Sequence, residues 1–127
     1  MLKPIPAKSQ RILIIDDDHS ICDILQELLV SLGYVVAVSH GVSDIDELIK
    51  KESPDLIVLD YLLPSINGGA LCKHIKENRL YSKIPVIIYS AYPLTMTSLS
   101  DYGCDAFITK PFDLNEMIDK IEKLTEG

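Results

Sequence analysis

The amino-acid sequence predicts an α/β fold: an open, doubly wound sheet of five parallel strands in the order 2-1-3-4-5, with helices on both faces. Short apolar runs alternate five times with segments of helical spacing. The runs are apolar throughout and rich in branched residues, which is typical of parallel strands buried on both faces. Such alternation indicates right-handed helical crossovers, and five units are too few for a closed eight-stranded barrel.

Two of the five predicted strands end abruptly at carboxylates. The first ends at Asp16-Asp17-Asp18, and the third, which includes Leu56-Ile57-Val58-Leu59, ends at Asp60.

Pro85 near the start of the fourth predicted strand is tolerable, because the first residues of a strand need not donate hydrogen bonds to the neighbouring strand. The predicted strands are residues 12–15, 35–38, 55–59, 84–89 and 106–108.

The segments between the strands are predicted helices. Asp18 or Ser20 can cap the first, and Gly33 stands where a helix C-terminus commonly has glycine. The second follows Gly41 and is broken by Ser53-Pro54.

The third helix follows a turn over residues 64–69 and runs to about residue 79, although Gly68-Gly69 weakens its start. The segment Tyr92–Tyr102 is the weakest helix prediction, because it contains Pro93 and few strong helix formers. Asp113 caps the last helix.

Composition limits the possible functions. The 127 residues fit one domain over residues 11–126, preceded by a flexible N-terminal tail over residues 1–10. The net charge of −7 argues against direct nucleic-acid binding and favours cations or a basic partner. No apolar run approaches the ~18 residues of a membrane span, so we expect no membrane association. The three cysteines are far apart and lie within apolar patterns, which is typical of small buried residues in a reducing compartment, so we expect a cytoplasmic protein.

Polar groups follow four strands whose carboxyl ends meet at one edge of the predicted sheet. They are Asp16-Asp17, Asp60, Ser90 and Lys110. Carboxylates a few ångströms apart repel by roughly 4 kcal/mol per pair at an effective dielectric of about 20, so positive charge must offset them. Lys110 supplies one charge, and Mg²⁺, which prefers oxygen ligands, suits the rest.

A carboxylate nucleophile, a divalent cation, a hydroxyl and an ammonium together suit a phosphoryl group. The motifs that carry these groups resemble those of response regulator receiver domains of two-component signalling, whose fold is flavodoxin-like. The motifs are Ile14-Ile15-Asp16-Asp17-Asp18, Leu59-Asp60-Tyr61-Leu62-Leu63-Pro64, Ile88-Tyr89-Ser90-Ala91 and Thr109-Lys110-Pro111-Phe112.

The resemblance implies a role for each site residue. Asp60 accepts a phosphoryl group from a histidine kinase or phosphotransfer protein. Asp17 binds Mg²⁺ directly, Asp16 binds it largely through water, and Asp60 and the backbone oxygen of Leu62 complete the protein ligands.

Two further residues match the family's switch positions. Ser90 resembles the switch hydroxyl, and Phe107 resembles the aromatic residue that swings inward with it. Lys110 resembles the lysine that pairs with the phosphoryl group, and Pro111 matches a cis-peptide position. The face around the fourth helix, fifth strand and fifth helix would then bind the output partner. The segment between Ser90 and Lys110 is slightly shorter than in the family, which leaves the choice of partner open.

The resemblance implies a switch and not a true enzyme, with only self-phosphorylation and self-dephosphorylation. Leu62 and Tyr92 are bulky, so hydrolysis of the aspartyl phosphate should be slow. The kinase, the output partner and whether the chain acts alone or within a longer protein stay open. His19, His40 and His74 have no metal-ligand spacing and are expected to be isolated surface or loop residues.

Three alternatives remain. A haloacid-dehalogenase-like phosphatase would use Asp16 and Asp18 as its acid pair, but His19-Ser20 follows where such enzymes usually place a threonine. A flavodoxin-like cofactor binder would need a phosphate loop where this chain has carboxylates. A degenerate receiver would bind partners without phosphorylation.

Overall fold

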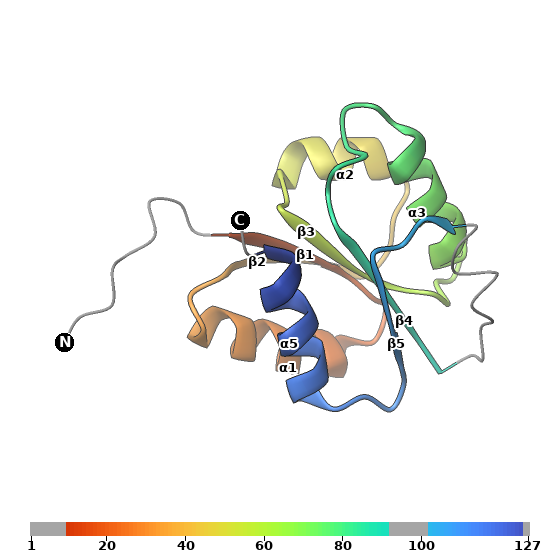
Figure 1. The fold of residues 1–127 in the computed structure, drawn as a ribbon. Coiled ribbons are helices and arrows are strands. Elements are labelled where there is room, and N and C mark those ends of the chain that lie inside the picture. The colour runs from red at the N-terminus through yellow and green to blue at the C-terminus, as the bar shows by residue number, and fades with distance from the viewer. Residues whose placement is uncertain (1–9, 92–101, 126–127) are drawn as a thin grey trace.

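The structure is a computed structural model that describes residues 10–91 and 102–125. Five parallel strands form one sheet in the order β2-β1-β3-β4-β5, and helices cover both of its faces (Figure 1). This confirms the predicted fold class and strand order. The predicted tail lies outside the described residues apart from Gln10, and so does the predicted fourth helix apart from Tyr102.

Each strand follows its apolar run closely. The register pairs Ile14 of β1 with Val58 of β3, and it pairs Asp60 of β3 with Tyr89 of β4. The carboxyl ends of the strands therefore lie at one edge of the sheet. The strands are β1 (Arg11–Ile15), β2 (Val35–Ser39), β3 (Leu56–Asp60), β4 (Val86–Ser90) and β5 (Ala106–Thr109).

The helices begin at the capping residues that the sequence offers. The Asp18 carboxylate accepts from the backbone N–H groups of Ser20 and Ile21 at the start of α1, so Asp18 and not Ser20 is the cap. Gly33 has a φ of 100°, the left-handed conformation that follows many helices. The helices are α1 (His19–Ser31), α2 (Ile45–Glu52), α3 (Gly68–Glu77) and α5 (Leu114–Thr125).

Two apolar clusters, one on each face, hold the helices against the sheet. On one face, Ile14, Val58 and Tyr89 pack with buried residues of α1 and α5. On the other, Ile15 and Ile88 pack with buried residues of α2 and α3. Because successive strand residues point to opposite faces, a continuous apolar strand fills both clusters at once.

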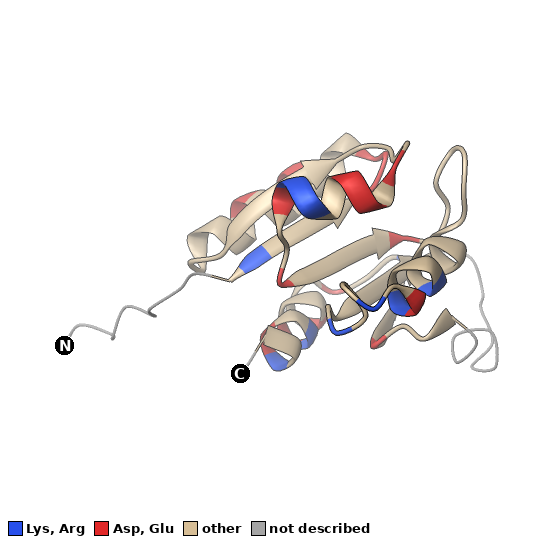
Figure 2. Cartoon of the chain, turned by 90° about the horizontal axis from the view of Figure 1, so that it is seen from above, with Lys and Arg blue, Asp and Glu red and all other residues tan. Residues whose placement is uncertain are grey.

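Charged residues are almost absent from the strands (Figure 2). Among the five strands, Arg11 at the start of β1 and Asp60 at the end of β3 are the charged residues. Burying an ion away from water is strongly unfavourable unless nearby groups compensate it. Asp60, which is 5% exposed, therefore needs partners at the sheet edge.

Two predicted boundaries need correction. β4 begins at Val86 and includes Ser90, so Ile84 and Pro85 precede the strand. Helix α3 begins at Gly68, inside the predicted turn, and ends at Glu77. The Asn67 side chain caps this helix by accepting from the Ala70 backbone N–H at 2.7 Å, a signal that the sequence prediction overlooked.

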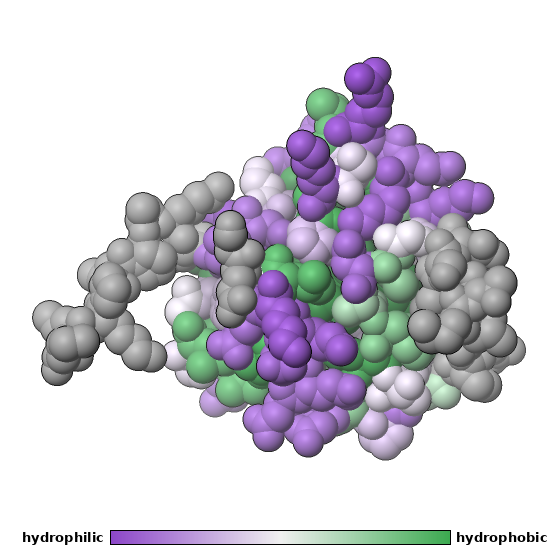
Figure 3. Space-filling model, viewed as in Figure 1, coloured by the Kyte–Doolittle hydropathy of each residue, from purple (hydrophilic) through white to green (hydrophobic). Residues whose placement is uncertain are grey.

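The outer surface follows the same division between polar and apolar residues. Figure 3 shows hydrophilic residues over α5 and over the side that α2 and α3 cover, with hydrophobic residues between them near the β5 edge of the sheet. Within residues 10–91 and 102–125, no helix has the length and apolar character that crossing a membrane requires.

Candidate functional site

The acidic residues predicted from the strand ends meet in space. Asp16 and Asp17 follow β1, and Asp60 ends the neighbouring β3. One carboxylate oxygen from each of these three residues lies within 4.8 Å of the others. Asp16 and Asp60 are buried and Asp17 is exposed, so the cluster is open to solvent on the Asp17 side.

This donor set fits a hard divalent cation. Three carboxylates at such distances repel one another, and hard cations such as Mg²⁺ take oxygen ligands while keeping some water. The solvent-facing Asp17 leaves room for those waters.

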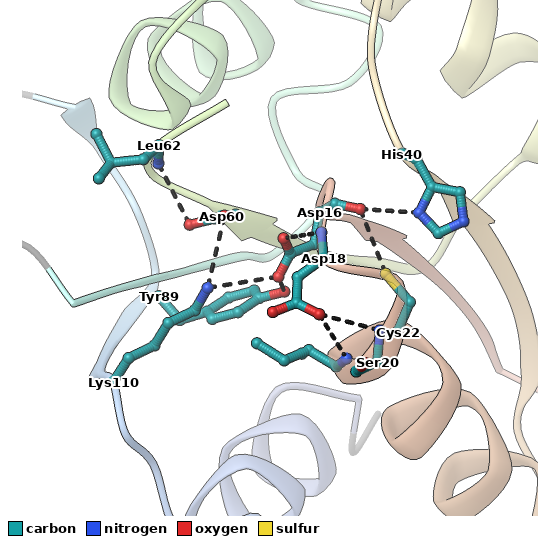
Figure 4. A network of polar contacts seen from close by, with 10 residues as sticks. Asp16, Asp18, Ser20, Cys22, His40, Asp60, Leu62, Tyr89 and Lys110 are labelled. Carbon is teal, nitrogen blue, oxygen red and sulfur yellow. Dashed lines mark hydrogen bonds and ion pairs between the residues drawn. The ribbon is translucent and has the colours of Figure 1, made fainter. Parts of the chain in front are cut away.

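Lys110 lies between the two buried carboxylates (Figure 4). Its Nζ is 3.5 Å from Oδ2 of Asp16 and 3.5 Å from Oδ2 of Asp60. The side chain is 17% exposed, so water screens its charge much less than at an open surface. The Lys110–Pro111 peptide bond is cis, as the resemblance implies.

Asp16 is held on both of its oxygens. Oδ1 accepts from the Asp18 backbone N–H at 2.9 Å, and Oδ2 accepts from the Tyr89 hydroxyl as well as facing Lys110. Burial would raise the pKa of Asp16, but the hydrogen bonds from Tyr89 and Asp18 and the Lys110 charge together lower it below its ordinary value. Asp16 is therefore an ionised, fixed carboxylate.

Asp60 has fewer donors. Its Oδ1 accepts from the Leu62 backbone N–H at 3.2 Å, and Lys110 faces its Oδ2. Burial raises the pKa of Asp60, the Asp16 charge raises it further, and Lys110 opposes both, which leaves this pKa at about 6. The Asp60 carboxylate is thus the less stabilised of the two buried acids, and additional positive charge would favour its ionised form.

The start of α3 lies close to the end of β3 because residue 68 is glycine. The Gly68 N–H donates to the Tyr61 carbonyl at 2.6 Å, and a Cβ on Gly68 would overlap the Asp60 carbonyl oxygen. From the sequence alone, this glycine is considered only for its effect on the helix start. Gly68 permits the close approach that fixes the loop after Asp60.

Ser90 and Phe107 lie on the two strands beyond Asp60. Ser90 is buried at the end of β4, and its carbonyl accepts from the Lys110 N–H at 2.8 Å, which ties β4 to the lysine. Phe107 on β5 is half-buried against the cluster on the α2 and α3 face. Ser90 is thus joined to Lys110 through the backbone, whereas Phe107 packs with the cluster on the α2 and α3 face.

Sequence reasoning missed Tyr89. This tyrosine is fully buried on β4, its hydroxyl donates to Asp16, and its ring centroid lies 4.5 Å from Lys110 Nζ. Burial and the contact with Asp16 both raise its pKa, so the hydroxyl keeps its proton. A signal was available, because a tyrosine inside an aliphatic strand must find a partner for its hydroxyl.

The three histidines are exposed, as expected, but the expectation that they are isolated is wrong. His19 and His40 stack with ring centroids 3.6 Å apart, and His40 Nδ1 lies 3.0 Å from the Asp16 carbonyl oxygen. His74 pairs with Asp46 at 3.1 Å, away from the acidic cluster. The histidines of the first pair come from separate elements, which sequence spacing alone did not connect.

The comparisons with known proteins agree with this geometry. The model of the response regulator receiver domain matches residues 12–122. The DNA-binding dual master transcriptional regulator RpaA of Synechocystis is 34% identical over 116 residues, which are 90% of this chain and 48% of that protein. A CheY-like receiver domain protein from Methanospirillum hungatei is 29% identical with a TM-score of 0.82, and the match covers 94% of this chain and 96% of that one.

A further solved structure is a complex with a metal ion. It is the response regulator TrrA of Thermotoga maritima in complex with Mg²⁺ and BeF, which is 27% identical with a TM-score of 0.79 over 91% of this chain and 98% of that one. This chain spans about half the length of the curated relatives it matches. The family model, the relatives and the convergence of acids and lysine at one sheet edge agree, and the chain belongs to the response regulator receiver domains of two-component signalling.

Proposed function

We propose that this receiver domain is a phosphoacceptor that is modified on Asp60 by a sensor histidine kinase or phosphotransfer protein in a Mg²⁺-dependent reaction. The observation that carries this proposal is the position of the Asp60 carboxylate, which lies within 4.8 Å of two further acids and 3.5 Å from Lys110. The phosphodonor brings its own activated phosphoryl group, so the domain needs only to position and stabilise that group.

In this proposal Asp17, Asp60 and the Leu62 backbone oxygen hold the cation, and Asp16 contacts it largely through water. When bound, Mg²⁺ supplies positive charge for the oxygens of the incoming phosphoryl group. The exposure of Asp17 and the engagement of both Asp16 oxygens with protein donors support this division of roles.

The transfer step follows from the positions of the side chains. An Asp60 carboxylate oxygen forms a bond to phosphorus while the bond from phosphorus to the donor's histidine nitrogen breaks, and that nitrogen keeps the electron pair. Lys110 pairs with the phosphoryl oxygens as their charge shifts. Ser90 donates to one of them, and Phe107 then packs inward, which alters the face around the fourth helix, β5 and α5 for an output partner.

An apolar pocket next to Lys110 supports docking of a protein phosphodonor. It has a volume of about 430 Å³, and Ile21, Ile24, Phe112 and Leu114 contribute to its lining. Ile24 is 52% exposed and Leu114 is 38% exposed, so apolar surface is available beside the site. We place the domain in the cytoplasm, where it acts as a switch whose self-dephosphorylation is slow.

The phosphatase alternative has less support. Its second acid would be Asp18, yet the Asp18 carboxylate caps α1 through Ser20 and Ile21. Asp18 is therefore committed to the helix and does not belong to the group of acids that share the site.

Acetyl phosphate tests the proposal without a kinase. Incubated with Mg²⁺, the wild-type protein should gain the mass of one phosphoryl group, and Asp60→Asn should gain none. Asp119→Asn, an exposed acid on α5, is the matched control and should behave as wild type. Labelling of Asp60→Asn, or steady turnover through Asp16, would contradict the proposal, whereas a chain that is never labelled yet binds partners would be a degenerate receiver.

A further inference from the structure

Tyr89 is an unusual neighbour for a site built from carboxylates and a lysine. It lies on β4, two strands away from Asp16, yet its hydroxyl reaches the Asp16 carboxylate across the buried end of β3. The side chain is wholly inaccessible to solvent, and its ring packs edge-on against Phe112 at a centroid distance of 5.6 Å. Packing on all sides therefore fixes the position of the hydroxyl.

The Tyr89 hydroxyl and the Lys110 ammonium occupy one of the two Asp16 oxygens, Oδ2. Asp18 takes Oδ1, while Tyr89 and Lys110 share Oδ2. A carboxylate oxygen has two lone-pair positions, so a metal ion that bound Oδ2 directly would have to displace one of these donors. Asp16 is also 0% exposed, so bulk solvent does not replace a donor that Oδ2 loses.

The aromatic ring has a second contact, with Lys110. The ammonium lies 4.5 Å from the ring centroid, within the range of a cation–π interaction, and 3.5 Å from each of the two buried acids. The Tyr89 side chain thus contacts both the Asp16 carboxylate and the Lys110 ammonium.

We propose that Tyr89 is a positioning residue that withholds Oδ2 of Asp16 from the metal ion and seats Lys110 between Asp16 and Asp60. The cation is then held chiefly by Asp17 and Asp60. The affinity of the site for Mg²⁺ is lower than it would be if all three carboxylates were available to bind the ion. The inference rests on the proposed magnesium site and adds a residue that sets its strength.

Tyr89→Phe tests the hydroxyl while keeping the ring under Lys110. In this variant Oδ2 of Asp16 has lost one hydrogen-bond donor and is not reached by bulk water. A bound cation can then interact with Oδ2 in place of the hydroxyl. We expect Mg²⁺ to bind Tyr89→Phe about fivefold to tenfold more tightly than wild type in calorimetric titrations, in line with part of one hydrogen bond to a charged group. Tyr81→Phe, at a buried tyrosine in the cluster on the opposite face, is the control and should match wild type.

A double-mutant cycle shows whether Tyr89 acts through Asp16. In an Asp16→Asn background, Tyr89→Phe should no longer change Mg²⁺ affinity, a result that a general packing role would not produce. Unchanged or weaker Mg²⁺ binding by Tyr89→Phe in an otherwise native Asp16 background overturns the inference. If wild-type protein itself binds no Mg²⁺, the proposed function fails and the inference fails with it.

A measurement on wild-type protein serves if Tyr89→Phe does not fold. The Tyr89 hydroxyl proton should give a slowly exchanging NMR signal that persists when Mg²⁺ saturates the site. Loss of this signal on addition of Mg²⁺ would show that the cation takes Oδ2, and it would overturn the inference.

Discussion

Asp60 is the residue at which stability and function oppose each other. It is 5% exposed, its neighbour Asp16 is ionised, and its pKa is raised to about 6. An unfolded chain binds the same proton only near the ordinary value of 3.8. The folded state therefore holds this proton more tightly, and the stability that this contributes is present at low pH and lost as the pH rises through about 6.

Replacing Asp60 by asparagine should remove that penalty. In chelator-treated buffer at about pH 7.5, Asp60→Asn should be more stable than wild type by up to roughly 3 kcal/mol, and the difference should shrink as the pH falls from about 6 toward 4. Urea unfolding across this pH range measures it, with Asp119→Asn as the control. A difference that stays constant with pH would mean that the Asp60 proton is not the cause.

At the scale of elements, the site depends on how closely α3 approaches the end of β3. Gly68 lies against the Asp60 carbonyl, and the Asn67 cap fixes where the helix begins. The loop between β3 and α3 carries Leu62, whose backbone N–H donates to the Asp60 carboxylate. A small displacement of this helix start therefore moves the backbone that orients the Asp60 carboxylate.

Gly68→Ala should reveal this dependence. The added Cβ would overlap the backbone of Asp60 and Tyr61, so we expect a loss of about 2 kcal/mol in unfolding free energy and weaker Mg²⁺ binding. Gly41→Ala is the matched control, because its Cβ would meet no atom within 4 Å. Equal stability and equal Mg²⁺ affinity in the two variants would contradict this account of α3.

The elements also show what could be predicted from the sequence. The apolar runs predicted the positions of all five strands. The carboxylates that follow two of these runs predicted the strand ends that form the site, because burying a charge without partners has a large free-energy cost. The start of α3 and the contacts of Tyr89, His19 and His40 were not predicted. They depend on how far side chains reach between elements, which periodicity along one element does not encode.

At the scale of the whole molecule, one sheet separates two clusters and gathers the reactive groups at a single edge. The α1 and α5 face carries Tyr89, which contacts Asp16, and the α2 and α3 face carries Phe107. Phosphorylation at Asp60 would thus act on side chains packed to either face. The curated relatives extend well beyond the length matched here, and the matched part of RpaA is 48% of that protein.

The central claim is that acids from the ends of β1 and β3 share one divalent cation. Titration of ¹⁵N-labelled protein with Mn²⁺ tests it directly, because the paramagnetic ion broadens the nearest amide signals first. The account predicts that the earliest broadening falls on residues 16–18 and 60–62 and that excess Mg²⁺ reverses it. Broadening centred on other exposed acids, such as Asp44, Asp46 and Glu47 near α2, would contradict the account.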